Sequence, residues 1–381
     1  MSDDWVVTPL GEVVVLQRGF DLPEYERNLG GVPVIGSFGI TGWHNHASVK
    51  GPGVTVGRSG ASMGVAFFSE HDFWPLNTAL FVRDFKGNDQ RFVYYLLKAI
   101  DFTSYNSGSA QPSLNRNYVA GRQVDLPPLR EQRAIAEVLG ALDDKIEANR
   151  SVATRATQLA ITAGANLLDS DAPKRSLGDV TEIIKGVSYR SADLVPGDGW
   201  LVSLKCAGRD GSFQADGLKP FSGEAKETQV VREGDVLVAQ TDLTQRGEVI
   251  GRPIRVETLG RSGRFVASLD YVIVRPRDGL TREVLFAILS QPEFRDHNLG
   301  YCNGTTVLHM NSVAVPKYAV RLPSLTAIAS ATSLMSALLK IADSARSENA
   351  LLIAVRDTLL PRLLSGELRV RDPEALVGDA A

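Results

Sequence analysis

The sequence predicts an α+β protein made by internal duplication. It consists of two α+β globular domains and two long helices that pack antiparallel as a coiled coil, with the two copies related by a pseudo-twofold axis. Three observations support this fold class. Similar residues recur at the start and end of two segments of similar length, short β-type runs bounded by glycine fill both segments, and a heptad pattern follows each of them.

The duplication is visible in an alignment of the two copies. Residues 10–13 read LGEV and residues 177–180 read LGDV, and a glycine follows each run at the same spacing. Residues 108–129 also align without a gap with residues 304–325. The matched pairs in this alignment are Gly19 with Gly186, Asn115 with Asn311, Val124 with Val320, and Leu126-Pro127 with Leu322-Pro323. Matches at both ends of both segments indicate a true repeat.

The globular domains are predicted at residues 1–127 and 173–322. Their β-branched and aromatic runs, such as Ala79–Val82 and Tyr271–Val274, are bounded by Gly, Pro, Asn or Asp, which is typical of strands. One helix is expected in each domain, near residues 91–100 and 281–289. Each domain is therefore expected to be α+β.

A helical spacer is predicted after each globular domain, at residues 128–172 and 323–368, and residues 369–381 form a tail. Apolar residues alternate at spacings of four and three, the pattern of a coiled-coil seam. The first seam is Ile135, Leu139, Leu142, Ile146, Asn149, Ala153, Ala156, Ala160, Ala163 and Leu167. The second is Leu334, Leu338, Ile341, Ala345, Glu348, Leu352, Val355 and Leu359, with Glu348 as a flaw. We expect the two seams to pack on each other, although each helix could instead pack on its own domain.

Composition restricts the function classes. The 381 residues carry a net charge of −3, so a nucleic-acid role requires that arginines gather on one surface or that partners supply positive charge. Only Cys206 and Cys302 are present, which fits a reducing compartment. The acidic start lacks the apolar region of a signal peptide, and no apolar run approaches the length of a membrane span. We expect a cytoplasmic protein with no membrane association.

Motifs for catalysis or metal binding are weak. Residues 57–64 are rich in glycine but lack the Gly-Lys-Ser/Thr ending of a phosphate loop. The histidines are scattered, without cysteine or carboxylate partners at metal-ligand spacing. Asp143 and Asp144 lie beside Lys145 on a predicted helix, where ion pairing is the simpler role. We therefore expect no catalytic residue, no metal and no bound cofactor in this chain.

A family resemblance emerges from the motifs between and after the two domains. Residues 126–136 read LPPLREQRAIA and residues 142–146 read LDDKI, which resembles the central region of type I restriction–modification specificity subunits. Residues 359–370, LLPRLLSGELRV, resemble the end of that family, and LGEV is typical of the start of its target-recognition domains. The second copy departs from the pattern, because residues 326–328 read TAI where residues 130–132 read REQ.

The resemblance implies a non-catalytic subunit that binds double-stranded DNA. Each globular domain would be a target-recognition domain that reads one half of a bipartite sequence, while the helices set the spacing. Two methyltransferase subunits would dock on it, and restriction and translocation subunits would join them. S-adenosylmethionine, ATP and Mg²⁺ would belong to those partners. A stand-alone methyltransferase or nuclease, and a coiled-coil scaffold without a DNA role, are the alternatives.

Candidate DNA-contacting residues are polar side chains in glycine-rich loops, because such side chains recognise base edges and glycine lets the backbone approach phosphates. Ordinary polar surface loops are the alternative interpretation. In the first domain the candidates are Thr41, Trp43, His44, Asn45, Arg58, Ser59, Ser109, Gln111, Asn115 and Arg116. In the second they are Arg190, Lys205, Gln240, Thr241, Thr244, Gln245, Arg246, Thr305, Thr306 and His309.

Overall fold

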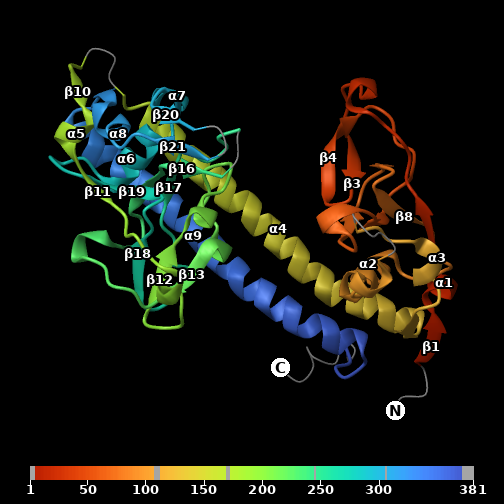
Figure 1. The fold of residues 1–381 in the computed structure, drawn as a ribbon. Helices are drawn as coiled ribbons and strands as arrows, with labels where there is room; N and C mark the ends of the chain where they lie inside the picture. The colour runs from red at the N-terminus through yellow and green to blue at the C-terminus, as the bar shows by residue number, and fades with distance from the viewer. Residues whose placement is uncertain (1–4, 107–111, 169–171, 244–245, 305–306, 371–381) are drawn as a thin grey trace. The chain divides into compact units, whose positions relative to one another are not determined.

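The structure is a computed structural model that describes residues 5–106, 112–168, 172–243, 246–304 and 307–370 (Figure 1). The chain divides into two compact units. Unit 1 comprises residues 1–146 and 352–381, and unit 2 comprises residues 147–351. Unit 1 is thus assembled from two distant parts of the chain, whereas unit 2 is continuous.

Unit 1 holds the first globular domain. Its strands are β1 (Val6–Pro9), β2 (Val15–Arg18), β3 (Val32–Gly36), β4 (Gly39–His44), β5 (Gly53–Gly57), β6 (Ala66–Ser69), β7 (Trp74–Pro75), β8 (Ala79–Asp84) and β9 (Gln123–Leu126). Its helices are α1 (Leu10–Val13), α2 (Gln90–Ala99) and α3 (Arg116–Val119). The strands form sheets of order β2-β8-β5-β6, β4-β3-β7 and β1-β9. Helix α2 begins at an Asp89 cap, whose side chain accepts from the Phe92 amide, and its apolar face is buried in the core.

Unit 2 holds the second globular domain. Its strands are β10 (Lys174–Ser176), β11 (Thr181–Lys185), β12 (Gly199–Val202), β13 (Leu218–Phe221), β14 (Val230–Val231), β15 (Val236–Ala239), β16 (Thr241–Asp242), β17 (Pro253–Arg255), β18 (Arg264–Ala267), β19 (Tyr271–Pro276), β20 (Cys302–Asn303), β21 (Leu308–Met310) and β22 (Ala319–Arg321). Its helices are α5 (Leu177–Val180), α6 (Arg282–Leu289), α7 (Pro292–Leu299) and α8 (Ala314–Lys317).

The strand order confirms the duplication. The sheet β11-β19-β15-β17 of unit 2 repeats the order β2-β8-β5-β6, and the pair β10-β22 repeats β1-β9. Strand β12 has an antiparallel neighbour in β13 and a parallel one in β18, just as β3 has β4 and β7. Unit 2 adds β14 and the small sheet β16-β21-β20. The α+β class and the repeat are therefore confirmed.

The two long helices are α4 (Leu129–Ala165) and α9 (Leu325–Leu364). In unit 2 the Asn149 amide donates to Glu348 at 2.8 Å and the Arg346 guanidinium donates to the Thr157 hydroxyl at 3.1 Å. Partner numbers fall along α9 as they rise along α4, so the helices are antiparallel, as predicted (Figure 1). Alanines 153, 156, 342 and 345 form the core of the helix pair there, since small side chains let helices approach closely.

The predicted seam is correct in phase for α4 and only partly correct for α9, where Ala345 is buried as expected. On α4, Ile135, Leu139 and Ile146 are buried, as expected. On α9 the buried residues are Met335, Leu339 and Ala342, whereas Leu334 and Ile341 are 57% and 49% exposed. One residue along a helix turns its side chain by about 100°, so the buried stripe lies beside the predicted one. Because α9 carries apolar residues on both stripes, periodicity alone cannot choose between them.

Helix α9 also corrects the expectation that no apolar run is long enough for a membrane span. By length and composition it is the one described helix that could cross a bilayer, with a mean hydropathy of 1.5 in its most apolar window. Its buried residues Met335 and Leu339, however, belong to the core of unit 2. Only 22% of that window is buried, so only part of its apolar surface packs in a protein core.

Candidate nucleic-acid interface

Arg58 directly follows β5 and is fixed by its backbone on both sides. Its amide donates to the Thr78 carbonyl at 2.9 Å, and its own carbonyl accepts from the Leu114 amide at 2.8 Å. The next residue, Ser59, forms an antiparallel bridge with Ser113. Three separate segments thus meet where β5 ends, and the Arg58 side chain starts from a rigid position.

The Arg58 guanidinium has no acidic partner among the described residues. Its one hydrogen bond there is from Nη1 to the Asn77 carbonyl, at 3.2 Å. An arginine that is half-buried, held by a carbonyl and not neutralised retains donors for a guanine edge or a phosphate.

The turn between β3 and β4 lies next to Arg58. Ser37 in this turn donates its hydroxyl to the same Thr78 carbonyl, at 3.0 Å, and Phe38 beside it is 70% exposed. Asn106 is also exposed and accepts from the Ser113 amide at 3.0 Å. Ser37, Phe38 and Asn106 were not predicted as site residues. The two-residue turn between Gly36 and Gly39 was the signal in the sequence for the first two.

The second domain repeats this arrangement around Gln240. The Gln240 amide donates to the Asp270 carbonyl at 2.7 Å, and its carbonyl accepts from the Met310 amide at 2.8 Å. Thr241 pairs with His309, as Ser59 pairs with Ser113. Gln240 therefore occupies the position of Arg58, and both side-chain types recognise bases by hydrogen bonding.

Exposure differs between the two equivalent positions. Gln240 is only 8% exposed, whereas Arg58 is half-buried. The side chains around Gln240 are more open, because His309 is exposed and Thr241 is half-buried, with its hydroxyl donating to Asp270 at 2.8 Å. We call the two groups the strand-end faces. The first comprises Arg58, Ser59, Asn106 and Ser113, and the second comprises Gln240, Thr241 and His309.

Two candidates at the end of β4 and just after it lie away from the first strand-end face. Trp43 and Asn45 are exposed, but they stand at the end of the β3–β4 hairpin opposite its turn, since His44 pairs with Val32. His44 itself is buried, and its Nδ1 accepts from the Asn28 amide at 3.1 Å. In this structure the His44 ring supports the hairpin from inside. Thr41 likewise donates its hydroxyl to the Val34 carbonyl within the hairpin, at 3.2 Å.

Asn115 and Arg116 begin helix α3. Asn115 caps it by accepting from the Asn117 amide at 3.0 Å. Arg116 is exposed and, with Arg83, lines a cavity of about 310 Å³. Neither arginine has an acidic partner among the described residues, so this cavity is lined by two available positive charges.

Three further cations of the second domain are at the surface. Arg190 is exposed at the start of the turn Ser191–Asp193, Lys205 is exposed in the turn Leu204–Cys206, and Arg246 is also exposed. The remaining candidates lie outside the described residues. They are Ser109, Gln111, Thr244, Gln245, Thr305 and Thr306.

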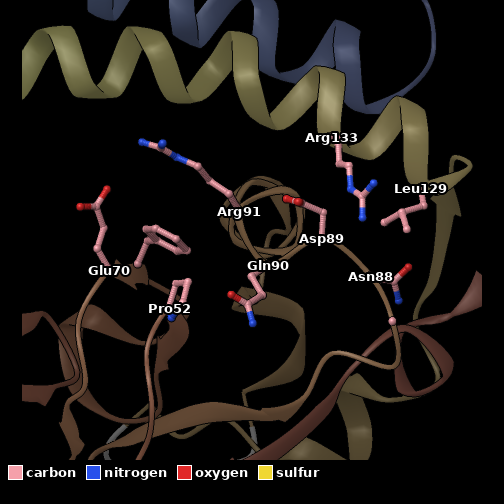
Figure 2. Close-up of a pocket in the computed structure, with 10 residues that line it drawn as sticks. Pro52, Glu70, Asn88, Asp89, Gln90, Arg91, Leu129 and Arg133 are labelled. Atoms are coloured by element: carbon pink, nitrogen blue, oxygen red, sulfur yellow. The ribbon is translucent and has the colours of Figure 1, made fainter.

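A separate open cavity of about 510 Å³ lies between the start of α2 and the first turns of α4. Figure 2 shows Arg91 and Gln90 projecting from α2, and Leu129 and Arg133 from α4. Behind it, Gln132 is 2% exposed and donates to the Asn88 side chain and the Pro127 carbonyl, both at 2.9 Å. The buried amide of the REQ motif is therefore a structural link between helix and domain.

Several acidic side chains in the described residues form ion pairs. No group of three or more His, Cys, Asp or Glu side chains there could hold a metal ion. Asp143 accepts from Tyr95 at 2.8 Å and from Arg356 at 2.7 Å. In unit 2, burial raises the pKa of Glu257 to about 7, although Arg346 donates to it at 2.8 Å.

Comparison with known proteins gives a family match for the first part of the chain. Residues 2–154 match the family model of the type I restriction modification DNA specificity domain. The specificity subunit of the type I restriction enzyme EcoprrI from Escherichia coli is 26% identical over 139 residues, which is 35% of this chain and 35% of that protein. The match thus spans about a third of the relative's length.

A solved structure extends the similarity in fold. The crystal structure of a type I restriction–modification S subunit from M. genitalium aligns with 96% of this chain and 97% of its own, with a TM-score of 0.63 and 13% sequence identity. At this identity the likeness shows a common fold. It covers both globular domains and both long helices.

Proposed function

We propose that this chain is the DNA-reading, non-catalytic subunit of a type I restriction–modification enzyme, the class to which the family model that matches residues 2–154 belongs. Each globular domain binds one half of a bipartite target in double-stranded DNA. The observation that carries this proposal is the repeated strand-end face, with Arg58 and Gln240 at equivalent backbone positions. A duplicated fold with different polar side chains at one position suits two different half-sites.

The reading residues of this proposal fall into two groups. Arg58 and Ser59 in the first domain, and Gln240, Thr241 and His309 in the second, stand on the strand-end faces. The other described candidates contact flanking bases or phosphates. They are Thr41, Trp43, Asn45, Asn115, Arg116, Arg190, Lys205 and Arg246. His44 acts indirectly, by supporting β4.

The helices have two proposed roles. They set the spacing between the half-sites, and they dock two methyltransferase subunits, which restriction and translocation subunits then join. Large apolar side chains at the surface of α4 and α9 support docking, because such patches mark interfaces. These side chains are Val152, Leu159, Leu334, Ile341, Leu351 and Val355. The proposed boundaries remain 1–127 and 173–322 for the domains, 128–172 and 323–368 for the spacers, and 369–381 for the tail.

The chemistry belongs to the partners in this proposal. S-adenosylmethionine is bound by the methyltransferase subunits, and ATP and Mg²⁺ serve the restriction and translocation subunits. This chain supplies base edges with hydrogen-bond donors and acceptors and supplies phosphates with guanidinium groups.

A domain exchange tests the proposal. Residues 1–127 are replaced by the matching segment of a relative, and the complex with methyltransferase subunits is incubated with a random DNA library. Sequencing of bound and methylated DNA should show one half of the target changed and the other half kept. Exchange of residues 173–322 is the matched control and should change the other half.

Three outcomes would contradict the proposal. A change of both halves in either exchange would mean that the domains do not read separately. Absence of any sequence preference, even with methyltransferase subunits present, would favour a scaffold. Methylation or cleavage of DNA by the purified chain alone would favour a stand-alone enzyme.

A further inference from the structure

Phe38 is held in place beside Arg58 by a shared carbonyl. The Thr78 carbonyl accepts both the Ser37 hydroxyl, at 3.0 Å, and the Arg58 amide, at 2.9 Å. The β3–β4 turn and the strand end are thus fixed to one atom. Phe38, the residue after Ser37, projects its ring from this fixed turn and is 70% exposed.

Close backbone packing makes the turn rigid. A Cβ atom on Gly57 would lie 2.4 Å from the Ser37 carbonyl oxygen, so only glycine fits between strand and turn. Gly39 has φ of +113°, a conformation that favours glycine, and it closes the turn by pairing with Gly36. A fixed aromatic side chain can contact a ligand with little loss of conformational entropy.

An exposed phenylalanine next to an arginine without an acidic partner suits the major groove of DNA. Arginine binds the O6 and N7 atoms of guanine, and phenylalanine makes apolar contact with the 5-methyl group of thymine. We propose that Phe38 contacts the 5-methyl group of a thymine adjacent to the base pair that Arg58 reads. This inference rests on the proposed function, and it assigns to the first domain a specificity residue that is not polar.

Among its described residues the second domain has no equivalent of Phe38. Its β12 ends at Val202 and β13 begins at Leu218, so residues 203–217 replace the short turn. Lys205 is exposed within this longer segment. The methyl contact is therefore specific to the half-site of the first domain.

The test uses DNA duplexes in which single thymines are replaced by uracil, which removes only the methyl group. The target is first defined by selection, and binding is measured for the full chain with its methyltransferase subunits. One uracil in the first half-site should weaken binding about fourfold, since a buried methyl group contributes on the order of 0.8 kcal/mol. The same uracil should have no effect on Phe38→Ala.

Tyr25→Ala is the matched control. Tyr25 is an exposed aromatic residue of the same domain, 86% exposed, in the turn Glu24–Glu26, and it has no proposed DNA contact. This variant should keep the effect of uracil in the first half-site. Uracil in the second half-site is the reference and should change binding by wild type and by Phe38→Ala equally. Thermal unfolding of Phe38→Ala should match wild type, because the ring is largely exposed.

Several results would overturn the inference. The selected first half-site could contain no thymine, or the uracil effect could persist in Phe38→Ala. Phe38→Ala could also impair only the assembly with methyltransferase subunits. Increased 2-aminopurine fluorescence that depends on Phe38, without a uracil effect, would show insertion between bases instead. In each case the proposed function stands if the wild-type complex still prefers a specific DNA sequence. If the wild-type complex shows no sequence preference, the proposed function itself is rejected.

Discussion

The two globular domains are joined to their following helices by different chemistry. At the start of α4 the buried residue is Gln132, whose side chain bonds the Pro127 carbonyl, the Asn88 amide oxygen and the Asp89 amide. At the matching position of α9 the residue is Ile328, also 2% exposed, within the apolar core of unit 2. One fold therefore accepts either a polar network or an apolar contact at the same junction.

The two junctions depend on different kinds of interaction. The network at Gln132 orients loop and helix through three hydrogen bonds, and it stabilises only if every member is satisfied. The contact at Ile328 depends on filled volume and is not directional. Replacing a side chain by one of similar size but different polarity should therefore lower the free energy of unfolding far more at Gln132 than at Ile328.

The largest expected effect follows from copying the second junction into the first. Gln132→Ile should lower the free energy of unfolding by about 3 kcal/mol, because the buried Asp89 amide and Pro127 carbonyl lose their partner. Urea denaturation followed by circular dichroism measures this. Arg133→Ala, at the exposed next residue, should cost less than about 0.5 kcal/mol. A loss below about 1 kcal/mol for Gln132→Ile would show that the network is dispensable.

A second comparison concerns adjacent carboxylates on α4. Asp143 is largely buried between Tyr95 and Arg356, whereas Asp144 is 57% exposed and pairs with Arg91. Asp143→Ala should cost about 2 kcal/mol, because the Tyr95 hydroxyl loses its acceptor and the poorly solvated Arg356 guanidinium keeps only its second carboxylate, Asp357. Asp144→Ala should cost under about 1 kcal/mol, since water screens its pair. Equal losses in thermal or urea unfolding would refute this distinction.

The smallest expected effect is a pH dependence of stability that arises in unit 2. Burial raises the pKa of Glu257 from 4.5 to about 7, so the folded chain keeps a proton that the unfolded chain releases. Stability from this group is therefore present below pH 4.5 and lost as pH rises to about 7. Residue 257 cannot titrate in Glu257→Gln, so the free energy of unfolding of this variant should fall less than that of wild type between pH 5 and 8. The difference should be on the order of 1 kcal/mol. Parallel pH curves for variant and wild type would assign the titration elsewhere.

Much of the fold was predictable because the pattern occurs twice. Paired positions such as Asn115 and Asn311 indicated the repeat, and the heptad patterns indicated the two long helices α4 and α9. The phase of α9 was not predictable, because Leu334 and Met335 are equally apolar and only packing decides which one is buried. The cap of α3 at Asn115 and the role of Gln132 likewise depend on tertiary partners.

The candidate site was predictable in residue type more than in position. Arg58 and Ser59 were chosen as polar residues in a glycine-rich loop, and the structure adds that Gln240 and Thr241 are their equivalents. His44 met the same chemical criterion, yet it is buried behind β4. Phe38 did not meet it, because an exposed aromatic residue in sequence looks like a core residue until its turn is placed.

The divided make-up of unit 1 has a consequence for synthesis on the ribosome. Leu360, Leu363 and Leu364 belong to the same core as Leu10 and Phe92, and Arg369 pairs with Glu131, whose carboxylate also accepts from Trp5. A nascent chain exposes the earlier part of this core until translation has passed residue 364, whereas the continuous unit 2 has all its residues by 351. The first domain to be translated is thus the last to be completed, and a premature stop in the final helix would leave its core open to chaperones and proteases.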